Sequence, residues 1–439
     1  MGVSGAAILR RGRLPTDIPD LHPIMHIRLS RRRLLTIAGA ATLPFALTGC
    51  AGRTLPDRVG PPPHALPPVA LPPVRTAVDR ITDITVCLRP FRPDGPRIAV
   101  EPVAGKTVVH HYGHGGSGWS LAWGSAVIAG ELAMRAAAAG PGPVDIAVIG
   151  CGAIGLTSAI QLQRMGARAT IYTRDMPPAV PSAAASGVWS PDSRICFQPQ
   201  ATPALKAMWE RMCRLSFKAY QDKLGLPGMP VEWVDLFIVQ RPPAASPAPP
   251  PAVAPAAAPA GEAEAADPRP AFATLRRELT PDLHPVSTVL EPGAHPFGDR
   301  PVRRNSNLIF NIAPYTRLLL EDFHRQGGRI VIRRFDRPAD LATLPEPVVM
   351  NCTGYGAKAL FGDDSLMPVR GQLARTAPQE DVRYMLYADQ VSFVPRRDGW
   401  VFQVVGPNDY YGYGSDDLTP DRAEAERAVS TITALFPQV

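Results

Sequence analysis

The sequence predicts an α/β protein with a Rossmann-like domain that binds a dinucleotide. The turn 150–155 reads GCGAIG, ends the apolar run 145–149 and opens the helix-like stretch 156–165. A second strand-like run, 167–173, leads to Asp175. Such glycines let backbone approach a pyrophosphate, the helix N-terminus offers free N–H groups, and an acid at this distance binds a ribose. The expected cofactor contacts in this unit are Gly150, Gly152, Ala153, Ile154, Gly155 and Asp175.

A GxGxxG turn alone is a weak signal, and a glycine-rich turn in another α/β protein is the alternative; the order strand, helix, strand and acid favours the dinucleotide.

Length and composition fit a globular protein. The chain has 439 residues, 45% of them hydrophobic and 19% charged, which suffices for two cores. The net charge of +7 includes N-terminal arginines, and no basic patch with interleaved aromatic residues indicates a nucleic-acid partner. No internal repeat is evident, and nothing indicates an oligomeric state.

Prolines are in excess, 51 in all, and they concentrate in two stretches. The first, 60–74, contains GPPP and LPP and is expected to form a stiff polyproline-II tether. The second, 242–272, consists almost entirely of proline and alanine. Because such a composition buries too little apolar surface to order itself, we expect a disordered surface loop.

The N-terminal region carries three export features in their usual order. Residues 30–35 read SRRRLL, a twin-arginine pattern, and the apolar run 34–47 follows, too short to span a bilayer. Residues 47–50 read LTGC, which resembles a lipoprotein cleavage site with Cys50 as the lipidated residue. These features predict an exported protein held at the bacterial cell envelope by a lipid anchor only, with Met25 as an alternative start. A basic cluster beside a core helix is the other interpretation.

The other cysteines and the histidines give no sign of a metal site. The cysteines are odd in number and lack metal-ligand spacing, so we expect five mostly buried thiols. They are Cys87, Cys151, Cys196, Cys213 and Cys352. Three histidines lie close together, at His110, His111 and His114. Without a further ligand cluster, we expect them to be loop histidines packed against backbone.

Two segments before the dinucleotide turn carry a distinctive pattern. Residues 84–97 read ITVCLRPFRPDGPR, and residues 108–124 read VVHHYGHGGSGWSLAWG. Together they resemble the C-terminal end of the D-amino-acid oxidase family, where an arginine–proline strand precedes a glycine-rich loop beneath the flavin. Four later segments also match in family order: YTRD at 172–175, AASGVWSP at 184–191, NCTG at 351–354 and PVRGQ at 368–372. The resemblance covers most of 80–439.

The resemblance implies a Rossmann-like FAD-binding domain and a substrate domain built on a mixed, largely antiparallel sheet. The FAD domain is expected to combine the βαβ unit with 329–357 and with the loop and helix 110–137. The substrate domain is expected to combine 192–325, 366–420 and 80–103.

The order of these pieces is rotated relative to the family. The family's C-terminal segment stands before the first strand, and the chain ends at 435–439 without a second copy of it. We therefore predict a circular permutation, which exposed loop tips and neighbouring termini tolerate. A misassembled gene is the alternative, and the in-frame signal, tether and joining linker 136–144 argue against it. The predicted divisions are 1–50 for the signal, 51–75 for the tether, 76–140 for the permuted segment, 141–191 for the βαβ unit, 192–328 and 366–439 for the substrate domain, and 329–365 for the return to the FAD domain.

The activity that the resemblance implies is oxidative deamination of a D-amino acid to a 2-oxo acid and ammonia, with FAD taking a hydride and oxygen as the final acceptor. Arg89 is expected to hold the α-carboxylate with its planar fork. The carbonyl of Gly116 is expected to accept a hydrogen bond from the substrate amine, and Arg92 to be structural. No side chain is expected to act as acid or base, so orientation of the substrate carries the catalysis.

Further site residues follow from the same resemblance. Those expected to contact FAD are Gly115, Gly116, Ser117, Gly118, Trp119, Ser120, Arg174, Ser186, Gly187, Val188, Phe335 and Thr353. Ser190 is expected near the substrate. Ser392 stands where the family has a carboxylate-binding tyrosine, and we expect Tyr410 or Tyr411 to compensate; a plain tyrosine-rich turn is the alternative. This departure keeps two other functions open: oxidation of glycine or a secondary amine, and a lipoprotein that has lost turnover.

Overall fold

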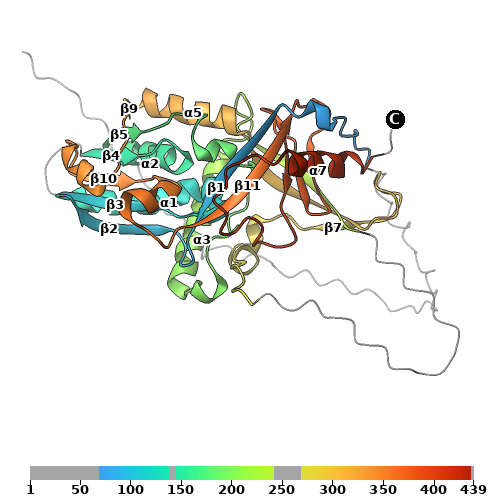
Figure 1. Ribbon diagram of the computed structural model, residues 1–439, viewed down its shortest axis with the longest axis horizontal. Helices are drawn as coiled ribbons and strands as arrows, with labels where there is room; N and C mark the ends of the chain where they lie inside the picture. Colours follow the sequence, from blue (N-terminus) through green and yellow to red (C-terminus); the bar gives the residue numbers. More distant parts are fainter. Residues whose placement is uncertain (1–68, 138–143, 242–267, 437–439) are drawn as a thin grey trace, which may run out of the picture. The chain divides into compact units, whose positions relative to one another are not determined.

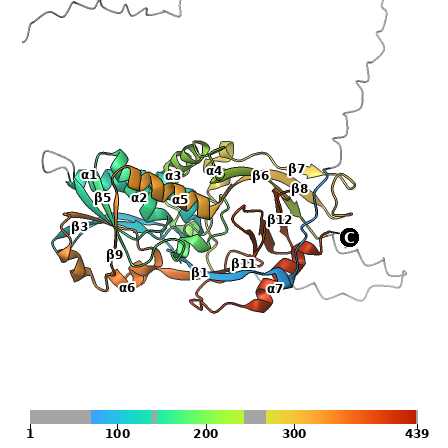
Figure 2. The ribbon, with the colours of Figure 1, turned by 90° about the horizontal axis from the view of Figure 1, so that it is seen from above.

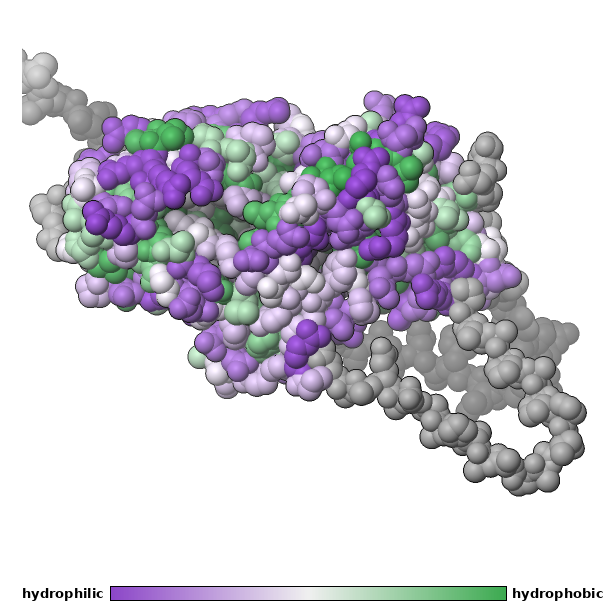
Figure 3. Space-filling view, viewed as in Figure 1, coloured by the Kyte–Doolittle hydropathy of each residue, from purple (hydrophilic) through white to green (hydrophobic). Residues whose placement is uncertain are grey.

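The computed structural model describes residues 69–137, 144–241 and 268–436. The twin-arginine signal, Cys50, most of the tether and most of the proline–alanine stretch lie outside this part of the chain. Among the helices that the structure describes, none has the length and apolar character needed to cross a membrane. Hydrophilic side chains cover most of the face seen in the space-filling view, with small apolar areas between them (Figure 3).

One sheet has six strands in the order β2-β3-β10-β4-β5-β9 (Figure 1). The strands are β2 (Arg97–Val103), β3 (Lys106–Tyr112), β10 (Val348–Asn351), β4 (Asp145–Ile149), β5 (Arg168–Thr173) and β9 (Arg329–Ile332). Neighbouring strands run parallel, except β2 and β3. Buried apolar residues occupy both faces of the central strands, as expected of a parallel sheet that is covered on both sides.

Helices α1 (Gly118–Ala137) and α2 (Ala153–Arg164) cover one face of this sheet (Figure 2). Helices α3 (Pro203–Gln221) and α5 (Ile312–Arg325) pack against α1 and α2 in turn. The sequence assigned α3 and α5 to the substrate domain. Their buried apolar stripes instead join the core of the six-stranded sheet, because that is where apolar helix faces are available to cover them.

The other sheet has eight strands in the order β1-β11-β14-β13-β12-β6-β8-β7. The strands are β1 (Asp83–Phe91), β11 (Met367–Thr376), β14 (Trp400–Val404), β13 (Val391–Val394), β12 (Tyr384–Ala388), β6 (Val231–Val239), β8 (Val302–Phe310) and β7 (Thr288–Leu290). All pairs are antiparallel except β12 with β6. Helix α7 (Arg422–Thr433) packs on one face of this sheet. The two sheets confirm the predicted α/β fold with a Rossmann-like domain and a mixed, largely antiparallel second sheet.

The remaining helical elements are short. They are α4 (Arg276–Leu279), α6 (Ala357–Phe361) and the 3-10 turns η1 (Val78–Arg80), η2 (Gly115–Ser117), η3 (Pro181–Ala184), η4 (Gln198–Gln200), η5 (Pro281–Leu283), η6 (Pro338–Thr343) and η7 (Gly354–Gly356).

The predicted extent 80–103 of the substrate domain was wrong in its second half. Strand β1 does join the eight-stranded sheet, but β2 pairs with β3 along its whole length in the six-stranded sheet. The two residues between β2 and β3, Ala104 and Gly105, both have positive φ, 51° and 75°. Two such residues form the tight turn that suits a two-residue hairpin, so local pairing decides where β2 lies.

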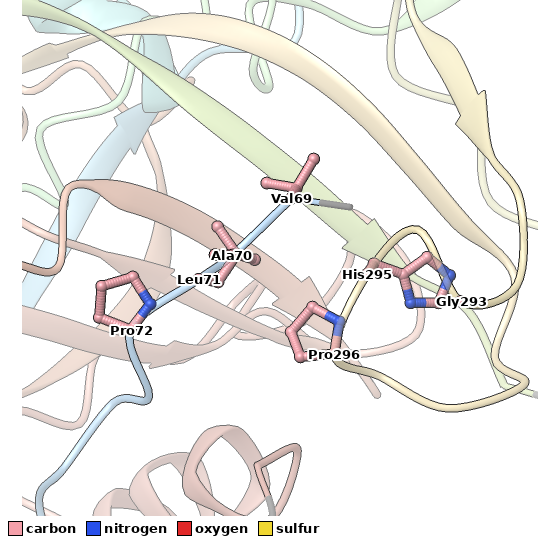
Figure 4. Close-up of a pocket in the computed structure, with 7 residues that line it drawn as sticks. All are labelled: Val69, Ala70, Leu71, Pro72, Gly293, His295 and Pro296. Carbon is pink, nitrogen blue, oxygen red and sulfur yellow. The ribbon is translucent and has the colours of Figure 1, made fainter. Parts of the chain in front are cut away.

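The described chain begins in contact with the fold. The Val69 N–H donates to the Ala294 carbonyl at 2.9 Å, and the Tyr384 hydroxyl donates to the Pro72 carbonyl at 2.5 Å. Residues 69–74, predicted as the end of the tether, therefore pack against the eight-stranded half. An open groove of about 550 Å³ beside them is lined by Val69, Ala70, Leu71, Pro72, Gly293, His295 and Pro296 (Figure 4).

Candidate active site

The turn between β4 and α2 leaves no room for side chains at two of its glycines. Gly150 has a φ of +108°, and a Cβ there would meet the Cys352 carbonyl oxygen at 2.7 Å. A Cβ on Gly155 would meet the Gly150 carbonyl oxygen at 1.9 Å. Helix α2 begins at Ala153, so its free N–H groups and positive dipole end open on this turn. The geometry suits a diphosphate held by backbone, as the sequence predicted.

A hydroxyl that the sequence did not predict lies at the same turn. Ser182 Oγ accepts the Ala153 N–H at 3.1 Å, and the Ser182 carbonyl accepts the Trp119 indole N–H at 2.8 Å. Ser182 thus ties η3 to the first turns of α1 and α2. Neither its residue type nor its spacing marks it in the sequence, because only the fold of η3 brings it to the turn.

The carboxyl ends of three neighbouring parallel strands gather other predicted cofactor residues. Gly150 follows β4, Asp175 lies two residues beyond β5, and Thr353 lies two residues beyond β10. The Asp175 carboxylate pairs with Arg174 Nε at 2.7 Å, and Thr353 Oγ1 donates to the Asn351 side chain at 2.7 Å. Ligands of open α/β sheets bind beyond such strand ends. The bare turn, the helix N-terminus and the acid therefore fit the dinucleotide part of FAD.

Phe335 lies a short way beyond β9, near the same edge of the six-stranded sheet. Its ring packs edge-on against Tyr172 of β5, with 6.2 Å between ring centroids, and the Arg333 guanidinium lies 4.8 Å from its centroid. The structure thus places Phe335 beside the strand that leads to Asp175, where the resemblance expected a cofactor contact.

The glycine-rich loop after β3 is pressed against residues 193–194. The Gly116 N–H donates to the Ser193 carbonyl at 2.9 Å, and the Ser117 hydroxyl donates to the same carbonyl at 3.0 Å. A Cβ on Gly115 would meet the Arg194 carbonyl oxygen at 1.9 Å. Glycine is therefore required for the loop to lie this close to the segment beside it.

The stretch 186–188 is held between β8 and the start of α1. Gly187 has a φ of +83°, and a Cβ there would meet the Phe310 carbonyl oxygen at 2.4 Å. The Phe310 N–H donates to the Gly187 carbonyl at 2.6 Å. Ser190 lies two residues beyond this stretch, and its N–H donates to the Ser120 hydroxyl oxygen at 2.8 Å. These bonds bring the predicted flavin contacts at 115–120 together with those at 186–188, and Ser190 with them.

Arg89 lies half-buried on β1, beside β11. Its Nη1 donates to the Arg370 carbonyl at 3.0 Å. A Cβ on Gly371 would meet Arg89 Nη2 at 2.5 Å, so this glycine leaves the space that the guanidinium occupies. Among the described residues, no carboxylate forms an ion pair with Arg89. The guanidinium is held in place by a neutral carbonyl, which leaves its charge available to an anion.

Arg92 makes contacts of a different kind. Its Nε donates to Ser365 Oγ at 2.9 Å and pairs with Asp363 at 3.4 Å, while its Nη1 donates to the Gly95 carbonyl at 3.0 Å. The charge is neutralised within the fold, which fits the structural role predicted for this residue.

A second arginine, Arg194, was not predicted. It has a positive φ of 50°, and its Nε donates to the Asp409 carbonyl at 2.6 Å. Burial and the neighbouring charge of Arg89 lower the pKa of Arg194 to about 10. The sequence gives no signal for this position, because it depends on a local left-handed turn and on a loop 215 residues further along the chain.

Ser392 lies on β13, where the family has a tyrosine. Its partner across β14 is Gln403, and the register continues through β11 to Arg89 on β1. Because side chains alternate between faces and opposite partners share a face, Ser392 and Arg89 lie on the same face of the sheet. Strands β11 and β14 lie between them, and a serine side chain is too short to replace a tyrosine across that span.

The structure separates the two candidate tyrosines. The Tyr410 ring lies 4.9 Å from the Phe272 ring, and its hydroxyl donates to the Pro270 carbonyl at 2.5 Å. It directly follows Asp409, the partner of Arg194. Tyr411 is not brought to Arg89, because it packs against the apolar cluster on the face that α7 covers. Phe272, predicted to end a disordered loop, is buried in this aromatic cluster because it fills the space beside Phe197.

The histidines are buried, and two of them lie on β3 rather than in a loop. His110 Nε2 and the Glu101 carboxylate are 2.9 Å apart, and His111 Nδ1 and the Ser158 hydroxyl oxygen are 3.0 Å apart. Burial, with a contribution from His114, holds the pKa of His111 well below its usual value. Burial also lowers the pKa of His114 to about 4. Both rings are therefore neutral near neutral pH.

The five described cysteines are unpaired thiols, as predicted, and all but the half-buried Cys87 are buried. Burial raises the pKa of Cys151 and of Cys352 to about 12, so neither is a thiolate at neutral pH. In the described ranges, no group of histidine, cysteine and acidic side chains is arranged to hold a metal ion.

A Rossmann-like domain with a bare glycine turn, beside a mixed sheet whose Arg89 has no carboxylate partner among the described residues, fits a FAD-dependent oxidoreductase. The model of the family described as FAD dependent oxidoreductase (DAO) matches residues 145–439. The chain belongs to this family. It is a FAD-dependent oxidoreductase of the D-amino-acid oxidase type, and FAD is its cofactor.

Three relatives carry the same name. The D-amino-acid oxidase of Rubrobacter xylanophilus is 25% identical over 298 residues, covering 66% of this chain and 77% of the relative. That of Dictyostelium discoideum is 24% identical over 296 residues, covering 67% and 74%. That of Streptomyces coelicolor is 28% identical over 300 residues, covering 67% and 78%.

Proposed function

We propose that the enzyme oxidises a D-amino acid to the corresponding 2-oxo acid and ammonia. The observation that carries the proposal is the Arg89 guanidinium, which lies in the space left by Gly371 without a carboxylate partner in the described chain. A planar fork of this kind binds a carboxylate through two parallel bonds. Relatives named D-amino-acid oxidases support an amino acid of the D configuration.

The residues of this chain would act by orientation. Arg89 holds the α-carboxylate, and the Gly116 carbonyl accepts one hydrogen of the amine. These two contacts fix an axis through the α-carbon, and a third contact, to the side chain or the flavin ring, would complete its orientation and so select the hydrogen that leaves. FAD, held at the glycine turn 150–155 and the loop 115–120, would supply the acceptor for that hydride, and oxygen would be the final oxidant and leave as hydrogen peroxide. The amine loses a proton to solvent, and water hydrolyses the imine to the 2-oxo acid and ammonia.

The nearby titratable groups are consistent with a site that needs no acid or base. His111 and His114 are buried and neutral, and the thiols of Cys151 and Cys352 are protonated. None of them is poised to exchange a proton at neutral pH.

Aerobic product analysis tests the proposed function. The holoenzyme is incubated separately with D- and L-amino acids, glycine and sarcosine, and 2-oxo acid, ammonia and peroxide are measured. Equal amounts of the three products from a D-amino acid, but not from its L-form, would support the proposal. Products from glycine or sarcosine alone would indicate an amine oxidase, and no products from any compound would indicate a protein without turnover.

We also propose that the chain is a circular permutation of the family fold. The family match begins at 145, yet two elements that precede it are integral to the fold. Strand β1 belongs to the eight-stranded sheet, and α1 belongs to the core of the six-stranded sheet. Near the end of the chain, Arg422 Nη2 donates to the Val78 carbonyl at 2.9 Å, and Phe436 shares an apolar cluster with Ile81. Residues 78–81 and 422–436, which lie near the two ends that a permutation would have separated, are therefore in contact. Val439 itself is outside the described residues.

We further propose that the protein is exported and lipid-anchored at the bacterial envelope. The support is the ordered succession of twin arginines, apolar run and LTGC, with Cys50 as the lipidated residue. Changing Arg31 and Arg32 to Lys should retain the protein in the cytoplasm, and Cys50→Ala should abolish lipid attachment. Cell fractionation and lipid labelling measure both effects, and unchanged fractionation of both variants would contradict the proposal.

A further inference from the structure

Arg194 extends from backbone that is fixed to the glycine-rich loop. Its φ of 50° lies in the left-handed region, where a residue with a long side chain is uncommon. Its own carbonyl occupies the space that a Gly115 Cβ would need, and the carbonyl of Ser193 accepts bonds from Gly116 and Ser117. The guanidinium therefore starts from backbone that is bonded to the loop carrying Gly116, the predicted acceptor for the substrate amine.

One edge of the Arg194 guanidinium is fixed, and its forked end is weakly engaged. Nε donates to the Asp409 carbonyl at 2.6 Å. Nη1 lies 3.5 Å from Ser193 Oγ, and Nη2 lies 3.5 Å from Asp409 Oδ1. Charge-assisted bonds are normally about 2.8 Å long, so both terminal contacts are loose. The side chain is only 10% exposed, and its orientation is set before any ligand arrives.

The charges around Arg194 leave an excess of positive charge. The loop that binds Arg194 through Asp409 also contacts β11 beside Arg89: the Arg370 N–H donates to the Gly412 carbonyl at 2.8 Å, and Arg89 Nη1 donates to the Arg370 carbonyl at 3.0 Å. After burial, the charge of Arg89 is the next cause that lowers the pKa of Arg194. The carboxylate of Asp409 is 56% exposed, and within the described chain Arg89 has no ion-paired carboxylate. Within the described chain, the only carboxylate in ion-pair contact with either guanidinium is therefore the half-exposed Asp409, which contacts Arg194. Because burying like charges is unfavourable, the site favours a further anion.

We propose that Arg194 binds a second carboxylate of the substrate, so that the enzyme prefers a D-amino acid whose side chain ends in a carboxylate. This inference rests on the proposed function and names its substrate class. Arg89 takes the α-carboxylate, and the forked end of Arg194 takes the distal one. The loose Asp409 contact gives way, while the Nε bond keeps the guanidinium in place. Arg194 acts as a specificity-determining residue.

The ratio of kcat/KM for D-aspartate or D-glutamate to kcat/KM for D-alanine tests the assignment. In wild type we expect the better acidic substrate to exceed D-alanine by about 10-fold or more. Arg194→Met should lower the ratio by about 150-fold or more, as for two lost charge-assisted bonds. Arg194→Lys should keep only part of the wild-type ratio, because an ammonium has no fork to bind both carboxylate oxygens. A general disturbance of the site affects both substrates and largely cancels in the ratio. As a matched control, Arg276→Met removes an exposed arginine that lies 3.7 Å from Asp192, and it should leave the ratio unchanged.

A measurement without turnover separates this inference from the proposed function. Succinate and propionate are titrated into wild type and Arg194→Met, and the change in the flavin spectrum gives each affinity. Succinate binding at least about 10-fold tighter than propionate in wild type, lost in Arg194→Met, would support the assignment even if no D-amino acid reduced the flavin. In that case only the proposed function would fail. Equal affinities for succinate and propionate in wild type would overturn the assignment of Arg194. The same ratio of succinate to propionate affinity in wild type and in Arg194→Met would also overturn it.

Discussion

Arg89 shows how a single residue can be charged, half-buried and still free to bind. The position of Gly371 on β11 removes the side chain that would otherwise lie within 2.5 Å of the guanidinium. A backbone carbonyl orients the fork without neutralising it. Arg92, three residues away, is neutralised by Asp363 instead. The difference between the two arginines therefore comes from their neighbours and not from their residue type.

At the same scale, the buried histidines should make stability depend on pH. The pKa of His114 falls from 6.5 to about 4 in the fold, so the unfolded chain binds a proton in a range where the folded chain does not. The contribution is complete above pH 6.5 and is lost as the pH falls toward 4. Between pH 7 and pH 5 we expect roughly 2 kcal/mol of this loss from His114.

Urea unfolding of wild type and His114→Gln at pH 7 and pH 5 measures this loss of stability. The variant should lose less stability on acidification, whatever its stability at pH 7. His324→Gln, at an exposed histidine, is the control and should behave as wild type. Equal pH dependence in all three proteins would contradict the assignment to His114.

Single residues also show where prediction from sequence stops. Arg89 could be predicted because its neighbours on both sides form a pattern within one strand and the loop that follows. Arg194 and Ser182 could not, because a left-handed backbone turn and the fold of η3 bring them to the site. Tyr411 was proposed for the site from sequence alone, but the turn at 406–413 directs it toward α7.

At the scale of elements, the junction of β4 and α2 depends on a contact between backbone atoms. Gly155→Ala would put a Cβ 1.9 Å from the Gly150 carbonyl oxygen, so helix and turn would have to separate. We expect FAD binding to weaken by at least about 30-fold, or ~2 kcal/mol. Fluorescence titration of the apoprotein with FAD measures the dissociation constant.

Gly130→Ala on α1 is the matched control for that change. A Cβ there would meet the flexible Met165 side chain at 3.0 Å, and alanine favours a helix interior over glycine. FAD affinity should stay close to that of wild type. If both variants bound FAD equally well, the close approach of Gly155 to the turn would not matter for the cofactor site.

The elements around the glycine turn were predictable from apolar runs and from the turn itself, the other segments were placed by resemblance, and the errors were errors of assignment. Strand β2 was given to the wrong sheet because the two-residue turn at Ala104 and Gly105 was not weighed against the resemblance. Helices α3 and α5 were given to the substrate domain because their sequence order, and not their apolar faces, was used. In each case a packing partner distant in sequence, or a backbone conformation, decided the outcome.

At the scale of the whole molecule, the rotated order has a direct test. A rearranged gene with 141–439 first and 76–137 last, joined by a short flexible linker, should fold and bind FAD. The contacts within 76–439 would be the same, and only loop-closure entropy would differ, so we expect a stability within about 2 kcal/mol of that of a chain that begins at residue 76 and so also lacks the contacts of 69–75. Urea unfolding and FAD titration measure both properties.

A gene that lacks 76–137 altogether is the control for the rearrangement. It would lose β1, β2, β3 and α1, which contribute to both sheets and to the core of the six-stranded sheet. We expect it neither to fold nor to bind FAD. A rearranged protein that behaved like this control would argue against the permutation.

The most direct test of the account is anaerobic mixing of the oxidised holoenzyme with a panel of D- and L-amino acids, followed by flavin absorbance. We expect at least one D-amino acid to reduce the flavin while its L-form does not. Arg89→Leu, with unchanged FAD content, should need about 100-fold more substrate for the same effect. Arg92→Leu should change this far less. Reduction of the Arg89→Leu flavin at the same concentrations as wild type would show that Arg89 is not the carboxylate anchor, and reduction by no D-amino acid would contradict the proposed function.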